Sequence, residues 1–267
     1  VYGWGIEVSQ PIFQGFRLLS TYQKAALQAD SDKASLRKAE LDMTEQVQTA
    51  FLEYLKAGEN TRSMRDSLAR LREQLRIAQA YFEVGLSPRL DVLQAEVDVS
   101  EAERLLIEAE NTQATTLARL NTLLGFDATA VNTYTGSLKE VGFRYTLEQC
   151  LELAYRQRPD LYVAQKAVEI ARKSQKEVQS DYYPQIEGYY SMTQSGNTPG
   201  MQRSGENGSH VTNWEVGAQA TWNVFEWGTT YYADKQAGWQ VTKMRYEQEN
   251  LKLEVGYDIK SKYLAVQ

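Results

Sequence analysis

The sequence of 267 residues contains one cysteine, one histidine and no hydrophobic run long enough to cross a membrane as a helix. A single cysteine, Cys150, excludes a framework of intramolecular disulfides, and its helical surroundings predict a buried structural thiol. The single histidine, His210, has no cysteine or second histidine near it, which predicts a solvated loop side chain. The sequence therefore predicts no catalytic residue, no metal site and no cofactor.

Basic residues are also in deficit, with 29 lysines and arginines against 35 acidic residues. This balance does not indicate a nucleic-acid partner. Mean hydropathy is low, at −0.52. It does not exclude a membrane β-barrel, because barrel strands are about 9 to 11 residues long and only half apolar.

Two segments alternate apolar with small or polar residues and then change to a helical pattern without a break. The alternation runs from Trp4 to Ile12 and again from Trp214 to Val224. A strand that is apolar on one face only is typical of a wall between lipid and water. We predict that the alternate residues Trp4, Ile6, Trp222 and Val224 face lipid. The polar strand residues predicted to face a water-filled lumen are Glu7, Ser9, Gln219, Thr221 and Asn223.

Proline is absent from about Arg17 to Val84, and Gly58 is the only glycine there, so nothing interrupts a helix. Apolar residues in this segment have heptad spacing, including Leu68, Leu71 and Leu75. A helix of this length is about 100 Å long.

The helix is predicted to stop at Val84-Gly85-Leu86-Ser87-Pro88. Gly85 suits a left-handed cap, and Ser87 is predicted to be the N-cap of a return helix with Pro88 in its first turn. Asp91 also falls in that first turn, where a negative charge is favourable.

The return helix, residues 89 to 124, carries two apolar stripes, one through Leu93, Val97 and Ile107 and one through Val92, Val99 and Ala102. Two stripes favour a helix with neighbours on both sides, as in a closed ring of helices. One broad stripe on a bundle helix is the alternative.

The remaining chain alternates between helix and strand patterns. A connector with a short helix beginning after Thr146 precedes Pro159, and an exposed loop is predicted in the Gly/Ser/Asn-rich stretch. The predicted organisation is a strand at 1–14, a helical hairpin at 15–124 with its tip at 84–91, a connector at 125–159, a helix at 160–182, a strand hairpin at 183–226 with a loop at 196–213, and a second long helix at 227–267.

The two strand-to-helix segments also align with each other. Pairing Phe13 with Phe225 gives an offset of 212 that matches Gly5 with Gly217 without a gap. Coincidence between two amphipathic helices is the alternative, but strand, phenylalanine and helix all fall in one register, which favours an internal duplication. Residue 1 lies inside a strand pattern, so we expect the sequence to be part of a longer chain.

With these features the sequence resembles the TolC-type outer membrane efflux proteins over nearly its whole length. The matching stretches are Ser9-Gln10-Pro11-Ile12-Phe13-Gln14-Gly15, Val84-Gly85-Leu86-Ser87, Asp91-Val92-Leu93-Gln94-Ala95-Glu96, Leu120-Asn121-Thr122-Leu123-Leu124-Gly125 and Arg158-Pro159-Asp160-Leu161. The sequence departs from the family in showing three of four strands and one of two helical hairpins. It also lacks a proline at the second junction, Trp222-Asn223-Val224-Phe225.

The resemblance implies a mixed α and β fold, in which a long-helix α-barrel continues into a transmembrane β-barrel shared by a homotrimer, with a small equatorial domain. It implies an outer membrane channel that extends into the periplasm and serves as a passive conduit of a tripartite efflux or type I secretion system. The implied partners are a periplasmic adaptor protein, an inner-membrane transporter and outer membrane lipid.

The resemblance also implies roles for the hairpin tip. Val84, Gly85, Leu86 and Ser87 would dock the adaptor, and Asp91 would hold a periplasmic gate closed. The alternative for both is a well-capped helical turn. At the level of the whole chain, the alternatives are a fibrous coiled-coil surface or filament protein and the adaptor itself.

Overall fold

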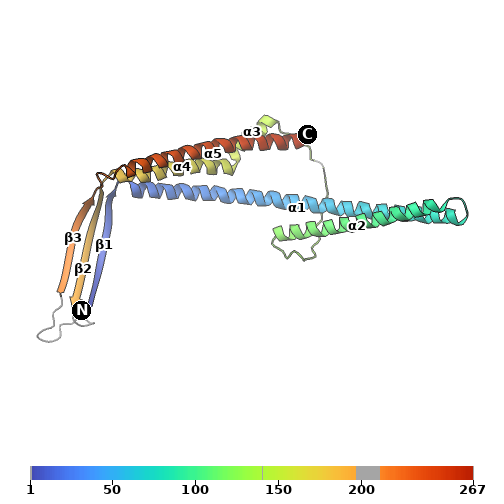
Figure 1. Ribbon diagram of the computed structural model, residues 1–267, viewed down its shortest axis with the longest axis horizontal. Coiled ribbons are helices and arrows are strands. Elements are labelled where there is room, and N and C mark those ends of the chain that lie inside the picture. Colours follow the sequence, from blue (N-terminus) through green and yellow to red (C-terminus); the bar gives the residue numbers. More distant parts are fainter. Residues whose placement is uncertain (1, 140, 197–210, 267) are drawn as a thin grey trace. The chain divides into compact units, whose positions relative to one another are not determined.

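The computed structural model describes residues 2–139, 141–196 and 211–266. It consists of long helices and one antiparallel sheet (Figure 1). The chain divides into two compact units, Val1–Lys38 with Tyr145–Gln267, and Ala39–Arg144. Within the described ranges, no helix combines the length and apolarity needed to cross a membrane.

The sheet belongs to the first unit and has three strands, β1 (Tyr2–Gln14), β2 (Gln185–Gly196) and β3 (Val211–Thr221), in that order. β1 includes the first alternating segment, Trp4 to Ile12, and β3 overlaps the second but begins earlier, at Val211, and ends at Thr221. β2 lies within the strand hairpin predicted at 183–226. Of the loop predicted at 196–213, Gly196 belongs to β2 and residues 211–213 belong to β3. The rest of the loop, including His210, lies outside the described residues, which omit 197–210.

The second unit contains a helical hairpin formed by α1 (Arg17–Glu83), from Ala39 onward, and α2 (Arg89–Leu123). Leu68 is buried against Val99 and Ala102, and Leu71, Leu75 and Leu106 pack around them, as the heptad spacing predicted. The buried Thr61 hydroxyl donates to the carbonyl of Ala109 at 3.2 Å, so the two helices approach closely there.

Only one of the two stripes on α2 packs against α1. The buried residues of α2 include Val92, Val99, Ala102 and Ala109, which belong to the second stripe. Leu93, Val97 and Ile107 of the first stripe are exposed. This helix therefore has an apolar surface beyond the one that forms the hairpin, as the two-stripe interpretation requires.

The hairpin tip differs from the prediction in one detail. Gly85 is left-handed, with φ 77°, as predicted. The N-cap of α2 is Pro88 and not Ser87, and no side chain caps the helix. The extended backbone of Pro88 directs the chain into α2, and the Ser87 hydroxyl is left buried without a hydrogen-bond partner.

A buried amide holds the connector that follows α2. Asn121 is fully buried, donates to the carbonyl of Ala130 at 2.8 Å and accepts a hydrogen bond from the Tyr134 hydroxyl at 2.8 Å. This accounts for an asparagine in the matching stretch Leu120 to Gly125, since an apolar residue there would leave both partners unsatisfied.

The first unit continues with α3 (Leu147–Gln157), α4 (Pro159–Gln179), the short 3₁₀ helix η1 (Ser180–Tyr182) and α5 (Thr229–Val266). Thr146 caps α3 as predicted, in a reciprocal pair with Gln149. Cys150 is a free, half-buried thiol, so the prediction of full burial is wrong. It lies on α3, which has no buried residue at all.

Both strand-to-helix junctions have the same unusual backbone. Gly15 and Phe16 are left-handed, with φ 57° and 68°, and so are Trp227 and Gly228, with φ 52° and 84°. The two pairs are 212 residues apart, as are the first residues of α1 and α5. The structure therefore extends the sequence duplication to backbone conformation.

The second junction begins earlier than predicted. β3 ends at Thr221, so Asn223 is not a strand residue. The Trp222 indole N–H donates to the carbonyl of Tyr182 at 3.2 Å, and the Asn223 amide donates to Glu226. These contacts belong to the junction, and they replace the strand pairing that the alternation suggested.

Candidate functional site

One face of the sheet carries the charged residues of the three strands and most of the polar residues predicted to face a lumen. Strand pairing places Glu7 opposite Ser191, and Ser191 opposite Glu215. The register also pairs Ser9 with Tyr189, Glu187 with Gln219, and Gln185 with Thr221. Four of the five residues predicted to face a lumen, Glu7, Ser9, Gln219 and Thr221, are thus on a common surface. Asn223 is not, because the strand has ended.

This polar face carries a net negative charge. The three strands contain three carboxylates, Glu7, Glu187 and Glu215, and no lysine or arginine. The Tyr189 hydroxyl donates to Glu215 Oε1 at 2.8 Å, and its ring lies over Gly217, where a Cβ would be 2.7 Å from the hydroxyl oxygen. Gly217 therefore leaves the space in which Tyr189 lies along the sheet.

The opposite face of the sheet is apolar. Ile6 pairs with Met192 and Met192 with Trp214, and the next row joins Val8, Tyr190 and Val216. Most of these side chains are exposed in the single chain, with Val8 56% and Val216 67% accessible, whereas Met192 is half-buried. An apolar sheet face of this kind requires a covering that one chain does not provide.

A bulge modifies the base of β1. The register shifts between Pro11 and Phe13, so Phe13 pairs with Ile186 on the apolar face. The ring of Phe13 makes edge contacts with Phe16 at 5.5 Å and Tyr183 at 6.5 Å between centroids. An aromatic cluster thus extends from the apolar face into the junction between sheet and helices.

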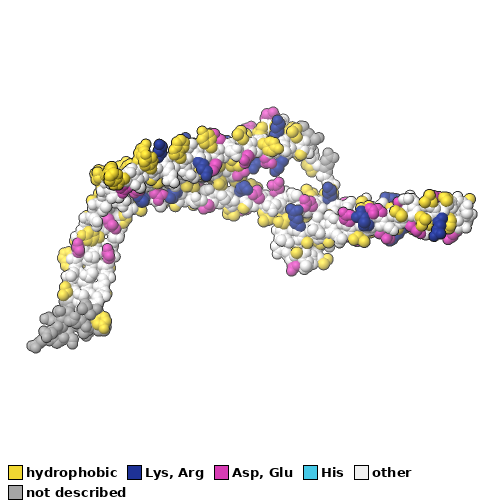
Figure 2. Space-filling view, viewed as in Figure 1, with side chains coloured by type: hydrophobic (Ala, Val, Ile, Leu, Met, Phe, Trp, Pro, Cys, Tyr) yellow, Lys and Arg dark blue, Asp and Glu magenta, His cyan; other side chains and the backbone are white. Residues whose placement is uncertain are grey.

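Hydrophobic side chains are conspicuous at this junction. Figure 2 shows them gathered where the sheet meets the helices and in patches along α5. The exposed residues of the second junction and the start of α5 are Trp222, Val224, Phe225, Trp227, Tyr231 and Tyr232. Tryptophan and tyrosine at the end of a strand suit the boundary between hydrocarbon and water.

Ion pairs join α1 to α4 and to η1 next to the sheet. Arg17 pairs with Asp181, and Lys24 pairs with Glu177, which also accepts a hydrogen bond from the Thr21 hydroxyl at 3.3 Å. The hydrogen bond from Lys24 lowers the pKa of Glu177 and outweighs its partial burial. The helices that continue β1 and lead into β2 are therefore held together at the point where the strands begin.

A second charged network fixes the other end of α4. Arg158 donates to Asp160 at 2.8 Å and to Asp258 of α5 at 3.2 Å. Burial raises the pKa of Asp160, but the hydrogen bond and charge of Arg158 and the Leu161 N–H outweigh it, so the net pKa lies below the ordinary value. The Arg158-Pro159-Asp160-Leu161 stretch therefore begins α4 and connects it to α5.

Asp160→Asn is expected to lower the thermal unfolding midpoint by a few degrees at pH 7, and the difference from the parent is expected to shrink as pH falls toward 3. A carboxyl whose pKa is lower in the folded state stabilises the fold above its unfolded pKa of about 4, and this contribution is lost as pH falls through the folded value. Circular dichroism melts of the purified proteins from pH 7 to pH 3 measure the difference in unfolding midpoint between the parent and Asp160→Asn. Exposed Asp66→Asn is the control, and a constant difference across this range would contradict the assignment.

The tip residues belong to the other unit. Val84 and Leu86 are highly exposed, at 67% and 76%, and Gly85 has open space around its Cα. The backbone N–H of Asp91 donates to the carbonyl of Pro88 at 3.1 Å, which places Asp91 in the first turn of α2 as predicted. The tip thus offers apolar side chains next to a carboxylate at the start of a helix.

In the described ranges, no three histidine, cysteine, aspartate or glutamate side chains form a group that could hold a metal ion. Sequence reasoning did not single out Asp258, Asp181 or Glu177 as partners in the ion pairs above. Their partners are about 100 or more residues distant in the chain.

Comparisons with known proteins agree with this architecture. The family model for outer membrane efflux proteins matches residues 1–126 and 150–267. The alkaline protease secretion protein AprF of Pseudomonas aeruginosa is 25% identical over 91% of this chain and 50% of its own length. The outer membrane protein TolC of Vibrio cholerae is 27% identical over 87% of this chain and 53% of its own.

The fold is also that of a solved channel. The CmeC outer membrane channel of Campylobacter jejuni superimposes with a TM-score of 0.77 and 18% identity, over 94% of this chain and 52% of that one. The chain spans about half the length of the curated relatives it matches.

Proposed function

Because the chain belongs to the outer membrane efflux protein family, we propose that it forms part of a passive outer membrane channel of a tripartite efflux or secretion system. The observation that carries this proposal is the two-faced sheet, which continues directly into long helices. Lipid against the apolar face and water against the polar face satisfy both surfaces at once.

The strands support a barrel made from several copies. Within the described residues, β1 and β3 each have one edge without a strand partner. Open edges are not tolerated in the hydrocarbon of a membrane, so further strands must close the sheet. A homotrimer in which each copy contributes four strands to one twelve-stranded barrel, as the family resemblance implies, provides that closure without any free edge.

The helices support a ring that continues the barrel into the periplasm. α5 packs on α4, and its Val241 and Val255 are buried. The opposite side of α5 has an exposed apolar stripe with mostly heptad spacing: Tyr232, Trp239, Tyr246, Leu253, Tyr257 and Leu264. Together with the uncovered stripe on α2, this favours helices that have neighbours on both sides.

The partners are assigned by the same resemblance. The hairpin tip, Val84 to Ser87, is proposed to dock a periplasmic adaptor, which its exposed apolar side chains favour. By the same resemblance, an inner-membrane transporter supplies the energy. The family match gives no support to the alternatives of a fibrous coiled-coil protein or an adaptor.

The proposed gate is Asp91, near the periplasmic entrance. A carboxylate in the first turn of α2 can accept hydrogen bonds from a neighbouring helix and hold the entrance closed.

Single-channel recording of the intact protein in planar bilayers tests both the channel and the gate. The parent is expected to conduct, and Asp91→Lys is expected to conduct several-fold more because repulsion replaces an attractive lock. Asp66→Lys, also exposed on the hairpin, is the control. A protein that inserts without conducting would refute the channel, and equal currents for parent and Asp91→Lys would refute the gate alone.

A further inference from the structure

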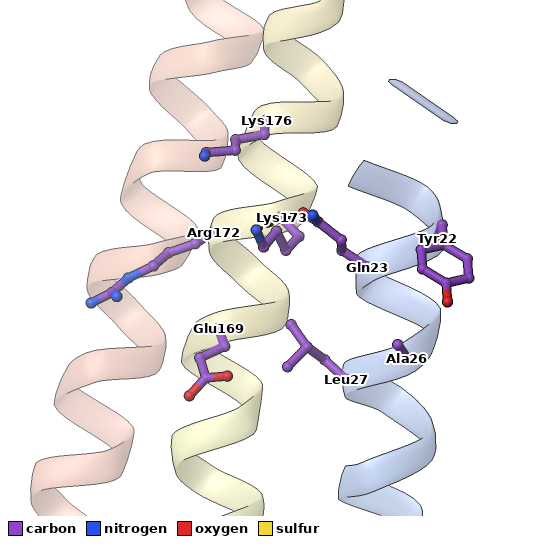
Figure 3. Close-up of a pocket in the computed structure, with 8 residues that line it drawn as sticks. All are labelled: Tyr22, Gln23, Ala26, Leu27, Glu169, Arg172, Lys173 and Lys176. Carbon is purple, nitrogen blue, oxygen red and sulfur yellow. Dashed lines mark hydrogen bonds between the residues drawn. The ribbon is translucent and has the colours of Figure 1, made fainter. Parts of the chain in front are cut away.

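A groove lies between the beginning of α1 and the last turns of α4. Its volume is about 450 Å³, and residues of both helices line it (Figure 3): Tyr22, Gln23, Ala26, Leu27, Glu169, Arg172, Lys173 and Lys176. A second hollow of about 530 Å³ shares Gln23, Lys173 and Lys176 with it and reaches Phe16, Tyr182 and Tyr183. One groove therefore leads from the helices to the aromatic base of the sheet.

The groove is positively charged because its acidic neighbours already have partners. Glu169 pairs with Lys166 at 2.8 Å, and Glu177 and Asp181 pair with Lys24 and Arg17 of α1. Asp234 of α5 accepts hydrogen bonds from Gln175 and Gln179 of α4 at 2.9 and 3.0 Å. In a chain with a net charge of −6, a local excess of cations stands out.

Of the cations that line the groove, Arg172, Lys173 and Lys176 have no carboxylate ion-pair partner among the described residues. Lys173 donates to the neutral Gln23 side chain at 2.7 Å, which leaves its charge uncompensated. Arg172 interacts with Glu169 only at longer range. In Figure 3 the side chains of Arg172 and Lys176 extend to the side of α4 away from α1, whereas Lys173 contacts Gln23 of α1.

The aromatic end of the groove identifies the face of the sheet with which it is continuous. Phe16 and Tyr183 line the second hollow, and both contact Phe13, which the bulge places on the apolar face. The cations therefore lie beneath the apolar face and not beneath the polar one.

Strand order keeps this groove clear of subunit interfaces. β1 and β2 are hydrogen-bonded neighbours, α1 follows β1, and α4 with η1 leads into β2. Another copy can extend the sheet only at the free edges of β1 and β3. The groove between α1 and α4 thus lies within one protomer.

We infer that this groove binds the phosphate of an anionic phospholipid in the leaflet next to the helices, an inference that rests on the proposed membrane function. Lys176 is three residues from the end of α4, about 5 Å along the axis, and Lys173 about 9 Å. The headgroup layer is roughly 5 to 8 Å thick on each side. Long basic side chains extend toward it, while Phe16, Leu19 and Tyr183 contact the upper acyl chains.

The test is lipid titration of the intact protein in detergent, followed by native mass spectrometry. The parent is expected to retain phosphatidylglycerol in preference to phosphatidylcholine. Lys173→Gln/Lys176→Gln is expected to weaken phosphatidylglycerol binding roughly 30-fold. Glutamine at residue 173 keeps a polar end for Gln23. Lys235→Gln/Lys243→Gln, which removes the same charge from α5, is expected to bind like the parent.

Equal phosphatidylglycerol binding by the groove variant and the parent would overturn the inference. So would binding of soluble glycerophosphate as tight as that of the lipid, because the occupant would then be free phosphate. Conductance of the same preparations in planar bilayers separates the lipid-binding proposal from the channel proposal. If the parent conducts but shows no preference for phosphatidylglycerol, the lipid-binding proposal is wrong and the channel proposal is unaffected.

Discussion

Val8→Arg is expected to abolish stable assembly in the outer membrane, whereas Ser9→Arg in the next position leaves assembly intact. Val8 lies near the middle of β1 on the apolar face, in a row with Tyr190 and Val216. An arginine facing lipid at the membrane midplane costs about 2 to 4 kcal/mol, and a trimer carries three copies of the change. The combined penalty of roughly 6 to 12 kcal/mol is comparable to the whole stability of a typical domain.

Ser9→Arg is the matched control because it adds the same charge to the same strand, but on the polar face. Membrane fractionation followed by electrophoresis of unheated samples measures the amount of inserted oligomer. We expect parent-like oligomer for Ser9→Arg and none for Val8→Arg. Insertion of Val8→Arg together with loss of Ser9→Arg would mean that the lipid and water faces had been interchanged.

Gly15→Ala is the second change with a large expected effect. Gly15 is left-handed, and a Cβ there would lie 2.4 Å from the carbonyl oxygen of Ser180 and 3.0 Å from its Cα. The cost is therefore not only the strain of about 1 kcal/mol for a positive φ, because the backbone at the end of α4 would also have to move. We expect a loss of several kcal/mol and separation of the junction between sheet and helices.

Gly85→Ala measures the cost of backbone strain at a positive φ without the steric clash that an added Cβ meets at Gly15. Gly85 has a similar left-handed φ, but nothing lies within 4 Å of the added Cβ. Its expected cost is only about 1 kcal/mol. Thermal melts of both variants measure the difference in stability. A Gly15→Ala variant as stable as Gly85→Ala would show that the backbone of Ser180 is not packed against the turn at Gly15.

The regular elements could be predicted because their signals are local. Alternation over β1 and heptad spacing over α1 depend only on which side of an element is buried, and such patterns are visible in any sequence that has them. The end of β3 could not be predicted in this way. Trp222 and Val224 continue the apolar alternation, yet Trp222 is held by the distant carbonyl of Tyr182 and belongs to the junction.

The candidate site was predictable only in part, because contacts between residues distant in the sequence leave no local pattern. The polar strand positions followed from alternation, but their common surface needed the register that joins Glu7, Ser191 and Glu215. Lys173 and Lys176 look like an ordinary solvated helix face in the sequence. Their excess charge becomes visible only when the neighbouring Glu177 and Asp181 are seen paired with residues of α1.

The central claim is that the polar face of the sheet lines a water-filled pore, and thiol labelling during single-channel recording tests it most directly. Ser191→Cys lies on the polar face and Met192→Cys on the apolar face of the same strand, with Cys150 replaced by serine in both variants. A charged, membrane-impermeant methanethiosulfonate reagent is expected to reduce the current of Ser191→Cys in discrete steps and to leave Met192→Cys unchanged. A current that responds at Met192 and not at Ser191 would contradict the account.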